Sequence, residues 1–137
     1  MTQYKSDFLN VLQQRGLIHQ ISDADALDKK LCEGMQTAYC GFDATASSLH
    51  IGNLIGIIML HWFQETGHRP ITLMGGATTM LGDPSGKEEQ RQLKTKEEIE
   101  TNISSIRTAF ESFITYGDSG NGAAMVNNAD WMLEFKY

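Results

Sequence analysis

The sequence predicts an α/β fold in which helices pack on a parallel sheet. Three short apolar segments, at residues 37–42, 71–74 and 123–126, have the length and composition of buried strands. The two segments between them, residues 50–66 and 95–113, carry apolar side chains at helical spacing. A strand–helix–strand–helix–strand order implies parallel strands with right-handed crossovers, because each helix returns the chain to the same edge of the sheet.

Composition excludes several classes of protein. The chain has 137 residues, 41% hydrophobic and 20% charged, which is the balance of one globular domain and not of a disordered chain. Its longest apolar stretch, residues 49–63, is interrupted by glycine, asparagine and histidine and is too short to cross a bilayer. A buried helix is expected there, and no membrane partner. The net charge of −6 argues against a main RNA-binding surface in these residues and favours small-molecule chemistry.

The cysteines and the first residues indicate a compartment. Cys32 and Cys40 are too few for a disulfide framework or for a zinc site of paired CxxC motifs. The first seven residues lack the apolar core of a signal peptide. A cytoplasmic protein with reduced thiols is therefore expected.

Two helices are expected before the sheet. Residues 7–17 form an amphipathic pattern that Gly16 ends. Residues 22–25, Ser-Asp-Ala-Asp, are typical of an N-cap with acids in the first turn, and the helix that they open runs through Leu31 and is ended by Gly34. Residues 1–34 are therefore predicted to be an N-terminal helical segment.

The connections between the strands also have local signals. The glycine-rich and polar residues 75–94 predict a long loop, and loops of that length are usually functional. Residues 95–98 match a capping box, and the helix behind it carries Ile99, Ile103, Ile106, Phe110 and Phe113. Residues 117–122 predict a turn before the last strand.

The topology predicts a binding site at one edge of the sheet. In open parallel sheets, ligands bind beyond the carboxyl ends of the strands. Three segments follow those ends, at residues 43–53, 75–87 and 127–131, and they hold most of the chain's unusual polar residues. His50 and Asn53 can face one ligand at a helix start, where free amides and the helix dipole favour phosphate. With Thr45 as a donor and Gly52 as an open approach, these residues could hold a nucleoside triphosphate.

The same segments resemble one family. His50-Ile51-Gly52-Asn53 resembles the HIGH signature of class I aminoacyl-tRNA synthetases, and the preceding residues 39–46, Tyr-Cys-Gly-Phe-Asp-Ala-Thr-Ala, resemble its tyrosyl members of bacterial type. Residues 74–78 with 82–87, and 127–131, resemble the same family in the same order. Asn53 stands where the family more often has histidine. Its amide can donate to a ribose or phosphate oxygen but carries no charge, so an altered ATP contact is expected.

The resemblance implies a role for each matching residue. Four are implied to be catalytic, acting on the phosphates as pyrophosphate leaves: Thr45, His50, Lys87 and Arg91. Three are implied to bind substrate tyrosine: Tyr39 at the phenol, Asp83 at the ammonium and Asn128 beside the pocket. Five are implied to bind ATP: Cys40, Gly41, Asp43, Gly52 and Asn53. Mg²⁺ is expected to accompany ATP without an identifiable set of protein ligands.

The resemblance also implies partners and a larger architecture. L-tyrosine, ATP and tRNA(Tyr) are the implied partners, and a homodimer is the implied assembly. Residues 35–137 would be the first half of a Rossmann-like catalytic domain, without its KMSKS-type loop or an anticodon-binding domain. The chain alone is then expected to be inactive, and to self-associate through the faces that it leaves uncovered.

Other interpretations remain open on the sequence. The chain could be a non-catalytic piece that binds only a partner or a nucleotide. It could also belong to another adenylate-forming enzyme or nucleotidyltransferase with a HIGH-like turn. On local sequence alone, Tyr39 and Cys40 are equally packing residues of a strand, Asp83 part of a turn, and Lys87 part of a solvated loop.

Overall fold

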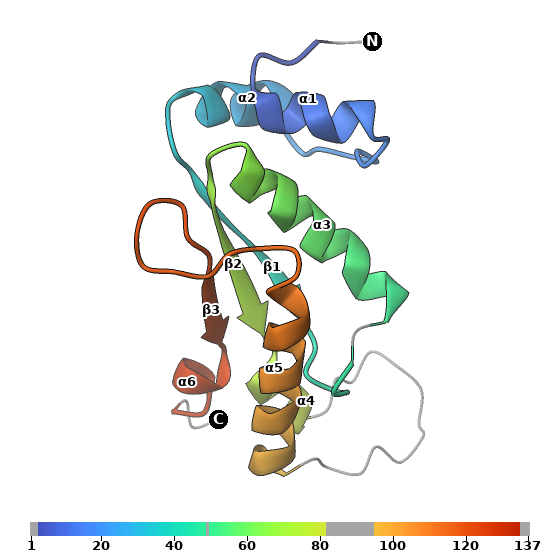
Figure 1. Ribbon diagram of the computed structural model, residues 1–137, viewed down its shortest axis with the longest axis vertical. Helices are drawn as coiled ribbons and strands as arrows, with labels where there is room; N and C mark the ends of the chain where they lie inside the picture. The colour runs from blue at the N-terminus through green and yellow to red at the C-terminus, as the bar shows by residue number, and fades with distance from the viewer. Residues whose placement is uncertain (1–2, 49, 82–94, 135–137) are drawn as a thin grey trace.

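The computed structural model describes residues 3–48, 50–81 and 95–134 (Figure 1). Asp83, Lys87 and Arg91 lie outside these described residues. The elements follow in this order: α1 (Asp7–Gln14), α2 (Ala24–Cys32), β1 (Thr37–Phe42), α3 (Ile51–Glu65), β2 (Arg69–Met74), α4 (Gly76–Leu81), α5 (Lys96–Phe110), β3 (Ala124–Asn127) and α6 (Ala129–Met132).

The sheet confirms the predicted topology. Its three strands lie in the order β1-β2-β3, and both pairs are parallel. Phe42, Met74 and Asn127 are paired across the last row, so the three carboxyl ends are level. β2 begins two residues earlier than expected because Pro70 is tolerated inside it. β3 starts opposite Ile71, so the missing N–H of Pro70 interrupts no ladder with β3.

One face of the sheet carries the core. α3 and α5 lie on the same side of the strands (Figure 1). Phe42 and Met74 from the strands pack there against Ile57 of α3 and Ile106 and Phe110 of α5. The rings of Phe42 and Phe110 lie 4.7 Å apart, which adds an aromatic contact to the buried apolar area.

The opposite face is less covered. Side chains alternate along a strand, so Tyr39 points away from the core that holds Phe42. Tyr39 is 70% exposed, and its neighbours across the sheet, Ile71 and Leu73, are half-buried. Self-association through the sheet edge and the uncovered helix faces stays a prediction.

α3 is less buried than its apolar sequence predicts. Ile57, Leu60 and Phe63 are buried, but Ile51 is 86% exposed and Ile55 is 58% exposed. α3 packs on the sheet through Ile57 and Leu60 and on the N-terminal helices through Phe63, and these contacts leave the start of the helix uncovered. No helix among the described residues is both long and apolar enough to cross a membrane.

The connections differ from expectation at three places. Residues 76–81, expected in a loop, form the short helix α4. A further short helix, α6, follows β3 and was not expected. α5 ends at Phe110, with Glu111 as its C-cap, so Phe113 packs from the following turn. The capping box of α5 is confirmed, because Thr95 Oγ1 accepts from Glu98 N and Glu98 Oε2 accepts from Thr95 N.

The N-terminal helices form a second apolar cluster on α3. Phe8, Leu9 and Leu12 of α1 and Leu31 of α2 pack around Phe63. The cluster is joined to the sheet at the start of β1. There the backbone N–H of Gln36 donates to His68 Nδ1 at 3.1 Å, and the His68 ring stacks on Phe63. The boundary at residue 34 stays a prediction.

This junction is expected to weaken in acid. His68 is only 5% exposed, and burial lowers its pKa. Protonation would remove the acceptor that Gln36 uses. The unfolded chain binds the proton more readily, so stability is unchanged above the ordinary histidine pKa of about 6.5 and falls as pH drops from there toward the lowered pKa of the folded state. Thermal melts at several pH values measure this.

A matched pair of variants isolates His68 in those melts. His68→Gln keeps a neutral acceptor at this position. It is expected to flatten the dependence of melting temperature on pH below about 6.5, the ordinary histidine pKa. His19→Gln, at an exposed position, is expected to leave the slope as it is. Equal slopes in all three proteins would contradict the assignment to His68.

Candidate active site

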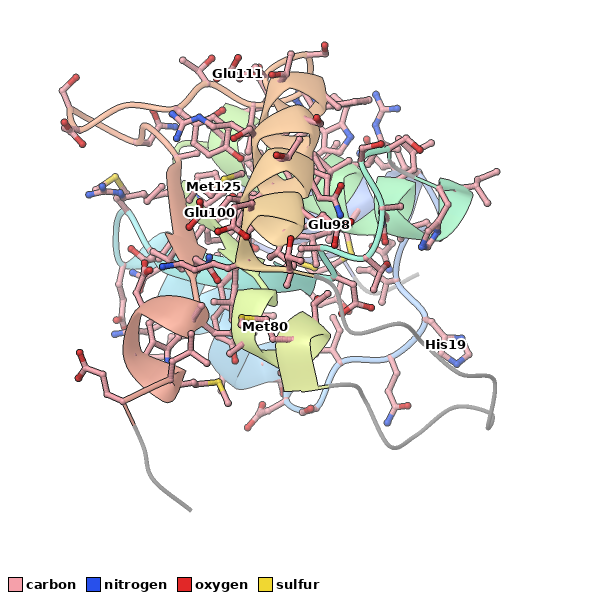
Figure 2. The ribbon with its side chains drawn as sticks, turned by 90° about the horizontal axis from the view of Figure 1, so that it is seen from below. His19, Met80, Glu98, Glu100, Glu111 and Met125 are labelled. Atoms are coloured by element: carbon pink, nitrogen blue, oxygen red, sulfur yellow. The ribbon has the colours of Figure 1, made fainter. Side chains whose placement is uncertain are left out.

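The three carboxyl ends of the sheet meet as the sequence predicts. The ladder continues one residue past the strands: Gly75 N donates to Phe42 O at 2.9 Å, and Asn128 N donates to Met74 O at 3.0 Å. The segments that start at residues 43, 75 and 128 are therefore held side by side. Figure 2 views the molecule from this end, where Met80 marks α4.

His50 forms the N-cap of α3. Its backbone is extended, and its Nδ1 accepts from the backbone N–H of Gly52 at 3.2 Å. An accepting Nδ1 places the proton of the neutral ring on Nε2, which is left as a donor. His50 is exposed, so this donor can reach a ligand at the helix start. The structure thus gives the predicted catalytic histidine a defined tautomer.

Gly52 and Asn53 complete the first turn of α3. A Cβ on Gly52 would lie 3.0 Å from the His50 ring, so a larger residue would displace the imidazole. Asn53 is half-buried, and its N–H donates to His50 O at 2.9 Å. Gly52 therefore leaves room for the His50 ring, and Asn53 holds the His50 backbone. Both residues also line the start of the helix.

The turn after β1 is held from beneath. Ala44 is fully buried, whereas Asp43 and Thr45 on either side of it are exposed. The Ala44 carbonyl accepts from Asn102 Nδ2 at 2.9 Å. Asp43 and Thr45 are thereby presented at the sheet edge, as the sequence predicts. Asn102 was missed; the available signal was a polar residue inside the apolar stripe of α5.

β1 places its three candidate residues on different faces. Cys40 is half-buried toward α3, where a Cβ on Gly56 would lie 3.0 Å from its Sγ. Tyr39 and Gly41 point to the other face of the sheet. Gly41 has no side chain and its backbone follows Cys40 directly, so its role beside Cys40 toward ATP stays a prediction. Burial raises the pKa of the Cys40 thiol. The thiol is therefore protonated at physiological pH, and it lines the site without acting as a nucleophile.

Two asparagines hold the start of α4. Asn128 is buried, and its Oδ1 accepts from Ala77 N at 2.8 Å. Asn127 Oδ1 accepts from Gly76 N at 3.2 Å and from Ala129 N at 3.0 Å. These carboxamides occupy the first free amides of α4, which explains why a helix forms in a glycine-rich segment. The role of Asn128 toward substrate stays a prediction.

Gly76 is expected to be intolerant of any side chain. A Cβ there would collide with the carboxamide of Asn127. Gly76→Ala should therefore cost about 1–3 kcal/mol of folding free energy, the usual cost of overpacking, and urea denaturation measures it. Gly117→Ala is the matched control because its Cβ meets nothing within 4 Å. Equal losses in the two variants would contradict a specific contact with Asn127.

Metal ligation is not evident in the described part of the chain. In residues 3–48, 50–81 and 95–134, no group of three or more His, Cys, Asp or Glu side chains converges on one point.

Comparison with known families decides the assignment. Residues 32–137 match the family model described as tRNA synthetases class I (W and Y). The chain belongs to this family. Among curated relatives of this class I synthetase chain, it is 57% identical to the tyrosine–tRNA ligase of Rhizobium meliloti and 54% identical to that of Bradyrhizobium diazoefficiens. Both alignments cover 100% of the chain and 33% of the relative, so the chain spans about a third of the relatives' length.

Solved structures agree with the fold of this class I synthetase chain. The C-terminally truncated mitochondrial tyrosyl-tRNA synthetase of Aspergillus nidulans superposes with a TM-score of 0.77 at 28% identity, covering 96% of the chain and 40% of that structure. The corresponding protein of Coccidioides posadasii gives a TM-score of 0.71, also at 28% identity, covering 96% and 38%. The predicted Rossmann-like α/β fold is confirmed.

Proposed function

We propose that the chain supplies the ATP side and part of the tyrosine pocket of a tyrosine–tRNA ligase. The observation that carries the proposal is the defined His50 cap at the level carboxyl edge of the sheet, in a chain 51–57% identical along its whole length to tyrosine–tRNA ligases. The other partners are proposed by the same likeness: ATP with its Mg²⁺, tRNA(Tyr) and a second subunit. Free Cys32 and Cys40 support a cytoplasmic setting.

The proposed reaction has two steps. A carboxylate oxygen of tyrosine attacks the α-phosphorus of ATP in line, and the bond to the bridging oxygen breaks, giving tyrosyl-adenylate and pyrophosphate. A terminal hydroxyl of tRNA(Tyr) then attacks the tyrosyl carbonyl carbon, AMP leaves and the hydroxyl proton is released. No side chain needs to act as nucleophile, so the protein accelerates the first step by positioning and charge stabilisation.

The geometry supports the binding of tyrosine and ATP on opposite faces of β1. Tyr39, assigned to the phenol of tyrosine, lies on one face of the strand, and Cys40, assigned to ATP, lies on the other. The two ligands would then meet beyond the carboxyl end of β1. There Thr45 and the Nε2–H of His50 are available as donors to the departing phosphates. Asp83, Lys87 and Arg91 would complete this site.

The test uses a chimera, because the chain covers about a third of its relatives. The chain replaces the aligned residues of the Rhizobium meliloti ligase, to which it is 57% identical. Tyrosine-dependent exchange of pyrophosphate into ATP is then measured. Activity comparable to that of the unmodified ligase supports the proposal. A folded chimera without tyrosine-dependent exchange contradicts it. Exchange that depends on tryptophan alone would show that the amino-acid substrate is tryptophan and not tyrosine.

A further inference from the structure

Asn102 is a polar residue on the buried face of α5. It is 9% exposed and lies between two core residues of the same face, Ile99 at 2% and Ile106 at 1%. Placing a carboxamide at such a position is unfavourable unless its polar atoms find partners. The residue therefore needs a reason other than filling the core.

The partner of Asn102 is the backbone of the turn after β1. Its Nδ2 donates to the Ala44 carbonyl at 2.9 Å, across 58 positions of sequence. The Ala44 N–H faces Thr79 Oγ1 of α4 at 3.4 Å. Ala44 itself is fully buried. The two sides of this one residue are thus held by side chains from two different helices.

The bond from Asn102 also orients the next residue. The peptide bonds of the described chain are trans, and in a trans peptide the C=O and the following N–H point in opposite directions. Because the Ala44 carbonyl points inward to Asn102, the N–H of Thr45 points outward. Thr45 is exposed, so its amide and its hydroxyl are both presented at the carboxyl edge of the sheet.

We propose that Asn102 is a positioning residue that fixes the Ala44–Thr45 peptide so that Thr45 meets the phosphates of ATP. The proposal rests on the proposed function for its chemical meaning. Asn102 touches no substrate; it acts through Thr45. Its loss should slow the chemical step while leaving the binding of tyrosine unchanged, because tyrosine is assigned to the other face of β1.

The main experiment compares two buried variants of α5. Asn102→Leu keeps a similar volume among apolar neighbours but removes the donor to Ala44. Ile99→Val trims the same face by one methylene and leaves that donor in place. In the active chimera, Asn102→Leu is expected to lower kcat for tyrosine-dependent pyrophosphate exchange by up to about 10²-fold, the cost of a group misplaced by about 1 Å, with the KM for tyrosine unchanged. Ile99→Val is expected to retain kcat.

A second measurement does not depend on activity. In the 137-residue chain, Asn102→Leu is expected to accelerate hydrogen exchange of the Ala44 amide and to shift its carbonyl ¹³C resonance, while the exchange of the Ile106 amide stays unchanged. Asn102→Asp gives a further check, because an ionised carboxylate of the same shape cannot donate to the carbonyl.

The outcomes separate this proposal from the proposed function. Slower kcat and faster Ala44 exchange confined to the Asn102 variants support positioning. Unchanged kcat, or the same loss in Ile99→Val, overturns it. If the unsubstituted chimera is inactive, the proposed function fails. The Ala44 exchange then decides by itself whether Asn102 holds the turn, and equal exchange in both variants would reject that.

Discussion

Replacement of His50 with alanine is expected to lower kcat for tyrosine-dependent pyrophosphate exchange by about 10²–10³-fold, the usual effect of removing one donor that stabilises developing charge. The ring is exposed at the start of α3, and its Nδ1 is already used by Gly52 N, so Nε2 carries the donor proton. The KM for tyrosine should change little. Tyrosine is assigned to the face of β1 that carries Tyr39, whereas His50 acts on ATP, which is assigned to the opposite face.

The control for this prediction must separate catalysis from capping. Alanine also removes the acceptor for Gly52 N, which costs about 1 kcal/mol of stability. Asparagine is a favourable N-cap residue but has no group in the place of Nε2. His50→Asn should therefore restore the melting temperature without restoring kcat. Recovery of both together would show that His50 only caps the helix. His19→Ala, which Figure 2 shows at the periphery, should alter neither.

Features with local causes could be predicted from the sequence. The capping box at Thr95 and the cap before α3 depend on residues within three positions of each other, and both are present. The parallel pairing of the strands followed equally well from the alternation of strand and helix patterns. The level carboxyl edge then placed residues 43–48 and 75–81 together without further information.

Features with distant causes could not be predicted. α4 begins at a pair of glycines, Gly75 and Gly76, which do not favour a helix. Its first amides are satisfied by Asn127 and Asn128, 51 residues later in the chain. Asn102 contacts a carbonyl 58 positions away. The exposure of Ile51 depends on how many layers pack on α3, which no pattern within the helix encodes. Lys87 lies outside the described residues, so its role stays a prediction.

Replacement of Gln64 with alanine is expected to be the largest loss of stability among these variants. Gln64 is a buried side chain at the end of α3. Its Nε2 donates to Thr115 O at 2.8 Å and to Asn121 O at 3.0 Å, and its Oε1 accepts from Thr115 N at 2.8 Å. One side chain thus fastens the segment that leads into β3. Removing it leaves Thr115 N and Asn121 O without this partner, whereas Thr115 O still accepts from Ala123 N at 2.8 Å.

The expected cost follows from those orphaned groups. A buried polar group without a partner costs about 1–3 kcal/mol, and two partly buried groups lose theirs, so Gln64→Ala should lose about 2–4 kcal/mol in urea denaturation. Gln64→Glu tests the donors separately: it keeps the acceptor for Thr115 N but sets a carboxylate against two carbonyl oxygens. It should therefore be no more stable than the alanine variant at neutral pH, and should recover stability as acid protonates the carboxylate.

Gln14→Ala, at an exposed position of α1, is the control and should change stability by less than about 0.5 kcal/mol. A small effect at Gln64 would mean that water replaces its bonds and that the segment before β3 is held by Ile114 and Ala123 in the core.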